Sequence, residues 1–260
     1  MSLKNYLSKL SFSSEMSANL KTFTAFIVNT KRYSSRFKKN NLDLNNRETF
    51  VYQFKKAKRK FDLYLRTFKG DIDIFYEIFW KNAYDKHLKL LKKNPEIIVD
   101  LGAHIGMTSI YFALKYPDVK IYSIEASPEN FELLKANTAS FKNITCFHAA
   151  AHFEDGSVNF GTQELSYNQK VSESGTPVQA LSVETFMKNN HIQQIDLLKI
   201  DIEGAEADLL SKNNSWLQNI ENIIIEIHAP YDSKKLSRDL EPFQLKIKQE
   251  EGDVLFAGKE

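Results

Sequence analysis

Residues 95–117 constrain the fold of this chain more than any other segment. They begin with a largely apolar run, 96–101 (E-I-I-V-D-L), whose length and β-branched residues predict a buried strand. Gly102 and Gly106 follow, and apolar residues then recur at helical spacing until Pro117 ends the helix. This order of buried strand, glycine-containing turn and helix predicts the first unit of a parallel α/β sheet.

The rest of the chain continues the alternation of strands and helices. The helix after the second strand begins at S-P-E (127–129), where Ser can cap the helix, Pro suits its first position and Glu suits its dipole. The expected strands are 96–101, 119–124, 143–148, 195–200, 222–228, 243–248 and 253–257, and the expected helices include 106–116, 182–190, 203–211 and 232–240. A short hairpin (G-S-V-N-F) plus a loop is expected within 152–180. The first five strands alternate with helices, which predicts a mostly parallel sheet covered on both faces, and the closing hairpin adds one antiparallel strand.

Residues 1–60 differ from the rest of the chain in charge and in pattern. They carry 14 Lys and Arg against 3 Asp and Glu, a net charge of +11, whereas the remainder carries 21 against 30, a net charge of −9. Their patchy apolar spacing predicts weak helices and no strong strand. Residues 71–91 have a clearer helical pattern and are expected to pack on the body. We therefore expect a basic, mainly helical N-terminal extension, 1–65, and a main domain, 66–260.

A basic extension can contact phosphate, lipopolysaccharide or an acidic membrane surface, although a solvated helical arm is the simpler interpretation. No stretch reaches the ~20 apolar residues of a membrane span, and no signal peptide is visible. The single cysteine, Cys146, excludes an internal disulfide and a cysteine-rich metal site. We expect a cytoplasmic protein, with peripheral membrane contact through residues 1–60 as a secondary hypothesis.

The turn at 100–106 (D-L-G-A-H-I-G) is predicted to bind an adenosine-containing cofactor, because it follows the first strand of a doubly wound sheet. Glu125 lies 23 residues after Gly102, at the end of the second strand, where a carboxylate can accept hydrogen bonds from both ribose hydroxyls. A dinucleotide calls for G-x-G-x-x-G, whereas the spacing here is G-x-x-x-G after Asp100. That acid would repel a pyrophosphate but suits the amino group of a methionine moiety. The pattern favours S-adenosylmethionine.

Four segments of the chain resemble the FkbM-type methyltransferases: G-D-I-D-I-F-Y-E-I-F-W-K-N-A-Y (70–84), V-D-L-G-A-H-I-G (99–106), I-E-A-S-P-E-N-F-E-L-L-K-A-N (124–137) and L-L-K-I-D-I-E-G-A-E (197–206). The resemblance runs from about Arg66 to Glu226, and the fourth segment is its most specific part. It implies a class I, Rossmann-like methyltransferase fold with S-adenosylmethionine as the methyl donor. It also implies O-methylation of sugars, or of polyketide and other secondary-metabolite hydroxyls.

The resemblance also implies roles for single residues. Asp100, Gly102 and Gly106 would hold the methionine end of the cofactor. Glu125 would hold the ribose, and Ala150 would lie beside the adenine. The full set of predicted cofactor residues is Asp100, Gly102, His104, Gly106, Glu125, Ala126, Ala150 and Tyr84. Tyr84 would close over the cofactor, and His104, where the family often has Asn, would either reach the acceptor or cap the loop.

Asp201, Glu203 and His228 are predicted to be catalytic. Asp201 ends the fourth strand and Glu203 follows on the loop, while Glu226 and His228 share one face of the fifth strand. A hydroxyl acceptor must lose a proton during methyl transfer, so a nearby base or metal ion helps. The three residues could bind Mg²⁺ or act as a metal-free base and its partner. Because Mg²⁺ prefers oxygen ligands, His228 suits the base better, and no metal is favoured.

Two further charged residues stand near this group in the sequence. Glu206 lies one helical turn after Glu203 and is expected only to charge the first turn of a helix. Lys199 lies within an otherwise apolar strand and is expected to pair with a carboxylate such as Asp201.

The leading hypothesis is an O-methyltransferase that acts on a sugar, a polysaccharide or another small hydroxylated metabolite. The alternative enzyme is an RNA or DNA methyltransferase that uses the basic arm for phosphate contacts. It is disfavoured because D-I-E-G (201–204) stands where such enzymes usually have N/D-P-P-Y/F. A non-catalytic cofactor-binding protein is the third hypothesis, and the intact Asp100, Glu125, Asp201 and Glu203 argue against it.

Overall fold

The computed structural model describes residues 3–39, 46–161, 170–171 and 175–260. Its centre is a seven-stranded sheet in the order β12-β13-β11-β10-β3-β4-β5. These strands are β3 (Ile97–Leu101), β4 (Lys120–Glu125), β5 (Ile144–His148), β10 (Leu197–Ile200), β11 (Asn222–Glu226), β12 (Leu245–Glu251) and β13 (Val254–Lys259). All neighbouring pairs from β11 to β5 are parallel, and β13 runs antiparallel to both β11 and β12. The predicted class I methyltransferase sheet, with its antiparallel C-terminal strand, is confirmed.

The strand order reverses beside β3. The chain runs outward from β3 through β4 to β5 and then returns to place β10 on the other side of β3. The carboxyl ends of β3 and β10 therefore meet at the point where ligands bind in open α/β sheets. The backbone N–H of Asp201 donates to the carbonyl of Leu101 at 3.1 Å, which holds the two strand ends together.

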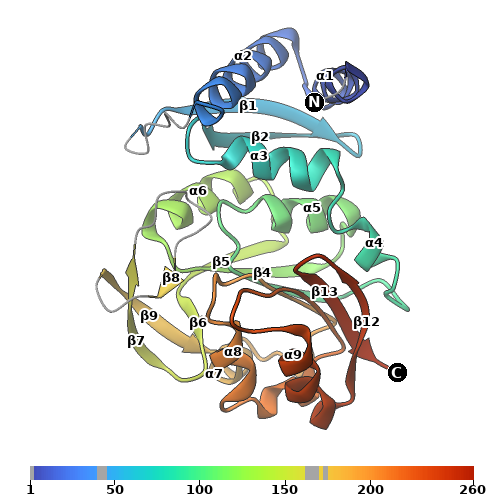
Figure 1. Ribbon diagram of the computed structural model, residues 1–260, viewed down its shortest axis with the longest axis vertical. Helices are drawn as coiled ribbons and strands as arrows, with labels where there is room; N and C mark the ends of the chain where they lie inside the picture. Colours follow the sequence, from blue (N-terminus) through green and yellow to red (C-terminus); the bar gives the residue numbers. More distant parts are fainter. Residues whose placement is uncertain (1–2, 40–45, 162–169, 172–174) are drawn as a thin grey trace.

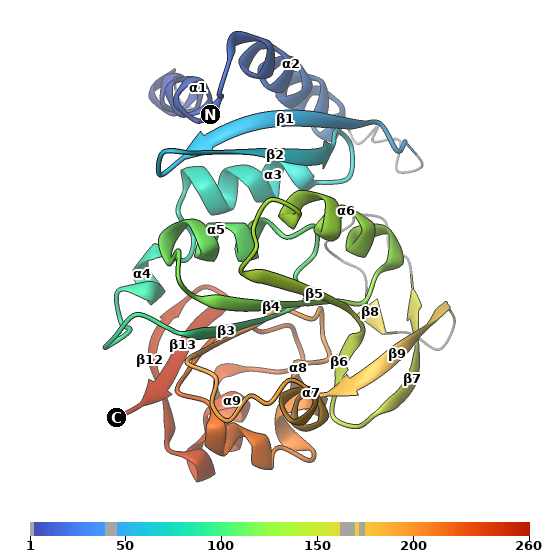
Figure 2. The ribbon, with the colours of Figure 1, turned by 180° about the vertical axis from the view of Figure 1, so that it is seen from behind.

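Helices cover both faces of this sheet (Figures 1 and 2). One face carries α5 (Met107–Lys115) and α6 (Pro128–Thr138), and the other carries α7 (Val183–Asn189), α8 (Glu206–Ser211) and α9 (Ser233–Leu240). Adjacent strand residues such as Ile98 and Val99 are both fully buried, and they belong to two different apolar clusters. Each strand thus buries both of its faces, which explains the nearly continuous apolar runs in the sequence.

The N-terminal part of the chain forms a layer over α5 and α6 (Figure 1). It contains α1 (Leu3–Met16), α2 (Leu20–Phe37), β1 (Thr49–Lys56), β2 (Arg59–Arg66), α3 (Asp71–Phe75), a π-helical turn (Tyr76–Trp80) and α4 (Asp85–Leu88). The expected helices are present over 3–37, but the expectation of no strand is wrong, because β1 and β2 pair as an antiparallel hairpin. Alternate residues of this hairpin, including Tyr52 and Phe54, are buried, and Phe26 of α2 packs edge-on against both rings.

The segment after β5 contains more strand than expected. The predicted G-S-V-N-F strand is confirmed as part of β7 (Gly156–Gly161), but it belongs to a separate four-stranded sheet with β6 (Ala150–His152), β8 (Lys170–Val171) and β9 (Thr176–Ser182). Part of the predicted loop, 162–169 and 172–174, lies outside the described residues. No helix among the described residues is long and apolar enough to cross a membrane.

Candidate functional site

A pocket opens at the carboxyl ends of the central strands. Its empty volume, including its opening to solvent, is about 990 Å³. The predicted residues that line it are Tyr84, Gly102, His104, Glu125, Ala126, Ala150, Asp201 and Glu203. Asp100, Gly106 and His228 are not among the lining residues. Lys199 and Glu226, which the sequence analysis assigned no cofactor role, also line it.

The two glycines of the loop after β3 serve different contacts. Gly102 has φ +75°, and a Cβ there would lie 1.7 Å from the carbonyl oxygen of Asp201, so only glycine allows these two loops to touch. Gly106 has φ +87°, and its Cβ would lie 2.7 Å from a methyl of Leu134 on α6. Gly102 therefore shapes the pocket, whereas Gly106 allows close packing of the loop against α6.

Glu125 at the end of β4 organises the backbone around the pocket. Its Oε2 accepts the N–H of His104 at 2.8 Å, and its Oε1 accepts the N–H of Ser127 at 2.8 Å. Burial raises the pKa of this carboxyl above its ordinary value, and these N–H donors oppose the rise. A carboxylate offers about four acceptor sites, so the same group can still accept from a ribose. This geometry fits the predicted role.

Asp100 is held beneath the loop by Lys199. The Nζ of Lys199 lies 3.1 Å from Oδ1 of Asp100 and 3.5 Å from Oδ2 of Asp201, and it donates to the carbonyl of Gly102 at 2.8 Å. The predicted pairing of Lys199 with Asp201 is confirmed, with Asp100 as the nearer partner. Burial alone would lower the pKa of Lys199, but Asp100 and Asp201 raise it above its ordinary value. Asp100 also accepts a hydrogen bond from Ser109 at 2.6 Å.

A buried ion pair lies on the other side of the cofactor loop. Arg66, the last residue of β2, contacts Asp71 through Nε and Oδ2 at 2.9 Å, and its Nη2 donates to Oδ1 of Asp71 and of Asn130, each at 2.9 Å. The same Nη2 lies 3.4 Å from Nε2 of His104. Both N–H groups of Nη2 already point to Asp71 and Asn130, so His104 is at most a shared acceptor at this distance. Burial lowers the pKa of His104 to about 3.

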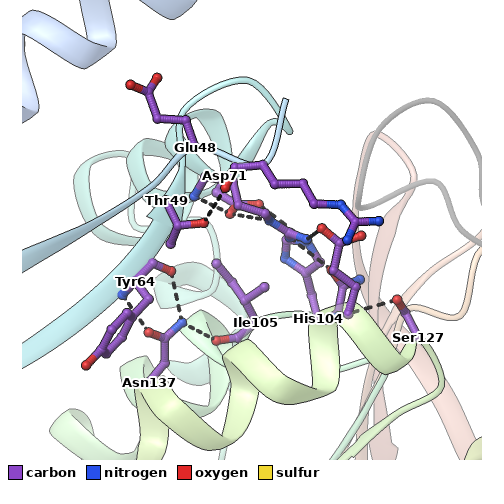
Figure 3. A network of polar contacts seen from close by, with 12 residues as sticks. Glu48, Thr49, Tyr64, Asp71, His104, Ile105, Ser127 and Asn137 are labelled. Atoms are coloured by element: carbon purple, nitrogen blue, oxygen red, sulfur yellow. Dashed lines mark hydrogen bonds and ion pairs between the residues drawn. The ribbon is translucent and has the colours of Figure 1, made fainter. Parts of the chain in front are cut away.

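Asn137 joins the same layer to the loop (Figure 3). This α6 residue accepts the N–H of Tyr64 in β2 at 2.7 Å and donates to the carbonyl of Ile105 at 2.8 Å. Figure 3 shows Asp71 beside His104, which has φ +52°. The N-terminal hairpin thus contacts the cofactor loop directly through Arg66 and indirectly through Asn137 of α6. No role for Arg66, Asp71 or Asn137 was predicted from the sequence.

The segment 74–84 forms another wall of the pocket, through Ile74, Glu77, Ile78, Ala83 and Tyr84. The ring of Tyr84 packs edge-on against Phe112 of α5, with 5.5 Å between ring centroids. Its hydroxyl accepts from Thr108 at 3.5 Å, and burial raises its pKa above the ordinary value. Tyr84 therefore lines the pocket beside α5, and its closing over the cofactor stays a prediction.

The three predicted catalytic residues are brought together at the ends of β10 and β11. One ligand atom from each of Asp201, Glu203 and His228 lies within 4.8 Å of the others. The Oε2 of Glu203 is 3.4 Å from Nε2 of His228, whose Nδ1 is 3.0 Å from Oε1 of Glu206. His228 therefore stands between two carboxylates, one at the pocket and one buried.

Glu206 does more than charge a helix turn, so that expectation is wrong. Its side chain is fully buried, and Oε1 accepts the N–H of Ile202 at 3.3 Å and of Gly204 at 3.1 Å in addition to its contact with His228. This carboxylate holds the loop in which Glu203 adopts φ +54°. Only the tertiary structure brings His228 to it.

The crowding of carboxylates changes their acidity. Burial, with Asp201 nearby, raises the pKa of Glu203 to about 7 and that of Glu226 to about 7. The hydrogen bond to Glu206 raises the pKa of His228 to about 9. At neutral pH His228 therefore carries a proton, while Glu203 is poised to take one. This acidity favours Glu203 over His228 as the base, the reverse of the preference drawn from the sequence.

The same three residues could hold a metal ion, with two carboxylates and one imidazole. Two features weigh against Mg²⁺: it prefers oxygen ligands, and Nδ1 of His228 is already held by Glu206 while the ring favours its protonated form. The metal-free reading remains our prediction.

The comparisons with known proteins identify the family. The methyltransferase FkbM domain family matches residues 100–249, more than half of the chain. The 31-O-demethyl-FK506 methyltransferase FkbM of Streptomyces tacrolimicus is 33% identical over 199 residues, which cover 61% of this chain and 75% of the relative. The hexuronic acid methyltransferase AglP of Haloferax volcanii is 22% identical over 157 residues, 59% of this chain and 64% of that protein.

A solved structure of methyltransferase FkbM from Methylobacillus flagellatus is 13% identical, with a TM-score of 0.46, and the match covers 98% of this chain and 59% of that one. The matched family segment includes the loops from Asp100 to Glu206 that build the pocket. The chain therefore belongs to the FkbM family of S-adenosylmethionine-dependent methyltransferases.

Proposed function

We propose that this enzyme transfers the methyl group of S-adenosylmethionine to a hydroxyl of a sugar, either free or within a glycan. One observation carries the proposal: Glu203 and Glu226, whose pKa values are raised to about 7, line the same pocket as Gly102 and Glu125. A proton acceptor and the predicted cofactor residues thus share one cavity, as methylation of a hydroxyl requires.

The cofactor would be held by the residues around the glycine loop. Glu125 would accept from the ribose hydroxyls, Ala126 and Ala150 would border the adenine, and Tyr84 would cover the methionine side. When bound, S-adenosylmethionine supplies an electrophilic methyl group on a sulfonium. Asp100 would attract the amino group of the methionine moiety from beneath the loop, because its carboxylate is fully buried against Lys199 and Ser109.

Glu203 would act as the general base. As the acceptor oxygen forms its bond to the methyl carbon and the carbon–sulfur bond breaks, the hydroxyl proton passes to a carboxylate oxygen of Glu203. A base with a pKa near the operating pH is most effective in this role. The imidazolium of His228, 3.4 Å away, would orient Glu203, and Glu206 would orient His228.

The acidic lining narrows the class of acceptor. Glu77, Asp201, Glu203 and Glu226 line the pocket, and its lysine, Lys199, is already paired with Asp100 and Asp201. An anionic acceptor would be repelled at this site. AglP is named for a hexuronic acid and FkbM for 31-O-demethyl-FK506. For this chain we expect a neutral or amino sugar instead of a uronic acid.

The test is release of S-adenosylhomocysteine when the enzyme is given neutral, amino and uronic glycosides, or RNA or DNA, each with and without a chelator. We expect turnover with a neutral or amino sugar, unchanged by the chelator and lost in Glu203→Gln. Asp208→Asn, an exposed carboxylate on α8, is the matched control. Loss of turnover in the presence of chelator would indicate that a metal ion, and not Glu203 acting as a metal-free base, activates the hydroxyl. Turnover of RNA or DNA alone, or cofactor binding without any turnover, would overturn the proposal.

A further inference from the structure

One side of α2 has no partner among the residues that the structure describes. Leu20, Thr24, Val28, Lys31, Ser35 and Lys38 are all exposed, and their spacing of three and four residues places them along one line of the helix. We call this line the α2 outer face. The buried residues of α2, Thr22, Phe26, Asn29 and Tyr33, lie on the opposite side, against the hairpin. Figures 1 and 2 place α1 and α2 at the end of the molecule farthest from α8 and α9.

Exposed apolar side chains are concentrated in this layer. Among the described residues, the large apolar side chains that are exposed are Tyr6, Leu7, Leu20, Val28, Phe37, Val51 and Leu90. All except Leu90 precede residue 52. Leu20 is 74% exposed and Val28 56% exposed, and both belong to the α2 outer face. Apart from Leu90, at 36%, the rest of the described surface covers its large apolar side chains, so the exposure is concentrated in one layer.

The same layer is strongly basic. Residues 3–39 contain eight Lys and Arg and one acid, Glu15. Lys21, Lys31 and Lys38 have no carboxylate within ion-pair distance among the residues that the structure describes. The chain after residue 60 is acidic, with a net charge of −9. A negatively charged plane would therefore attract the α2 end of the molecule and repel the rest, which sets its orientation.

We propose that the α2 outer face docks on the surface of an anionic phospholipid bilayer. Lysines satisfy the headgroup phosphates, and Leu20 and Val28 enter the boundary between headgroups and acyl chains, the usual arrangement of an amphipathic helix that lies on a membrane. A second copy of this chain would bring like charges together. Nucleic acid would match the lysines, but it would not use two exposed aliphatic side chains that lack a π face. The proposal is independent of the acceptor.

The experiment is flotation of the 260-residue chain with vesicles of phosphatidylcholine alone or with about 30% phosphatidylglycerol. We expect binding only to the anionic vesicles, and release as salt rises from about 0.05 M to about 0.5 M. Each lysine near such a surface contributes about fivefold to partitioning. Lys21→Ser/Lys31→Ser/Lys38→Ser should therefore bind about 100-fold more weakly. Leu20→Ser/Val28→Ser should also bind more weakly, at every salt concentration at which the unmodified protein binds.

Matched controls come from the other parts of the surface. Lys142→Ser/Lys188→Ser/Lys234→Ser makes the same charge change at exposed lysines elsewhere, and Leu90→Ser removes an exposed leucine from another region. Both should bind vesicles like the unmodified protein, and every variant should keep its calorimetric affinity for S-adenosylmethionine. Equal binding to neutral vesicles, or equal loss in the control triple variant, would overturn the proposal. The proposal would also be overturned if the protein bound single-stranded RNA more tightly than anionic vesicles and Leu20→Ser/Val28→Ser left that RNA binding unchanged.

Discussion

Arg66 and Asp71 form an ion pair that is closed to solvent, with Nε and Oδ2 2.9 Å apart and side chains 2% and 0% exposed. The pair joins the end of β2 to the start of α3, directly beside His104 of the cofactor loop. An isolated buried charge is costly, whereas a buried pair is often no better than apolar residues of similar size. Replacing one partner should therefore destabilise the fold much more than replacing both partners with apolar residues.

Arg66→Met should lower the free energy of unfolding by about 3–5 kcal/mol, because it leaves Asp71 charged and buried. Arg66→Met/Asp71→Leu should recover most of that loss. Urea unfolding followed by circular dichroism measures both, and Lys60→Met, at an exposed hairpin position, is the control. If the double variant is as unstable as the single one, the pair stabilises this layer through contacts other than the mutual neutralisation of two buried charges.

His104 gives a pH dependence whose sign follows from its lowered pKa of about 3. The unfolded chain binds a proton at this residue below its ordinary pKa of about 6.5, but the folded chain does not, so acid favours unfolding. His104→Asn removes this effect, and Asn tolerates the left-handed backbone. The stability of the natural chain relative to the variant should fall by about 1.4 kcal/mol per pH unit between about pH 6 and 4. A constant difference would mean that His104 is protonated in place.

The central sheet and the cofactor loop could be predicted because their signals are local. The run 97–101 is buried on both faces and reads as a continuous apolar strand, and Gly102 is required where it touches Asp201. The β1–β2 hairpin was missed because its turn is Ala57-Lys58, with φ +51° and +65°. Such turns usually carry Asn or Gly, so the strongest hairpin signal was absent.

The roles that sequence reasoning missed depend on residues that are distant in the chain. Glu206 looks like an ordinary acid in a first helical turn until β11 brings His228 to within 3.0 Å of it. Arg66 precedes the glycine loop by more than thirty residues, and its partners Asn130 and His104 come from different elements. No periodicity or spacing rule reports such contacts, because they arise only when the layers pack.

Glu125→Ala should weaken the binding of S-adenosylmethionine by about 10- to 100-fold. The change removes the proposed ribose acceptor and leaves the N–H groups of His104 and Ser127 without their charged partner, at a cost of about 1.5–3 kcal/mol. Isothermal titration calorimetry measures the affinity. Glu132 is an exposed acid on α6, the helix that Ser127 caps, and the Glu132→Ala variant should bind S-adenosylmethionine normally. Unchanged affinity in Glu125→Ala would remove the ribose assignment.

Glu206→Gln should lower the pKa of His228 from about 9 toward its ordinary value, because the hydrogen bond to the charged carboxylate is the largest cause of the rise. The amide oxygen can still accept from Ile202 and Gly204, so the loop should keep its shape. NMR titration of the His228 ring measures the midpoint, with Asp208→Asn as the control. Catalysis should fall through kcat while the KM for S-adenosylmethionine stays the same. A rise in the KM for S-adenosylmethionine together with the fall in kcat would indicate a disturbed pocket instead.

Glu203→Gln tests the base through activity and stability at once. With a pKa of about 7, Glu203 must lose its proton to accept one, so kcat should rise with pH through about 7 in the natural enzyme. The variant should lose this pH dependence and about 10²–10⁴ of the rate, and it should keep its cofactor affinity.

The raised pKa also predicts that the natural fold loses stability as pH rises from about 4.5 to 7, because the folded chain holds this proton more tightly than the unfolded chain. Glu203→Gln should therefore unfold at a higher temperature than the natural enzyme at pH 8, but not at pH 4. A variant that is slow yet no more stable at pH 8 would show that Glu203 is needed for catalysis without a raised pKa. A variant that keeps its rate and its pH dependence would place the base elsewhere, with Glu226 as the next candidate because its pKa is also raised to about 7.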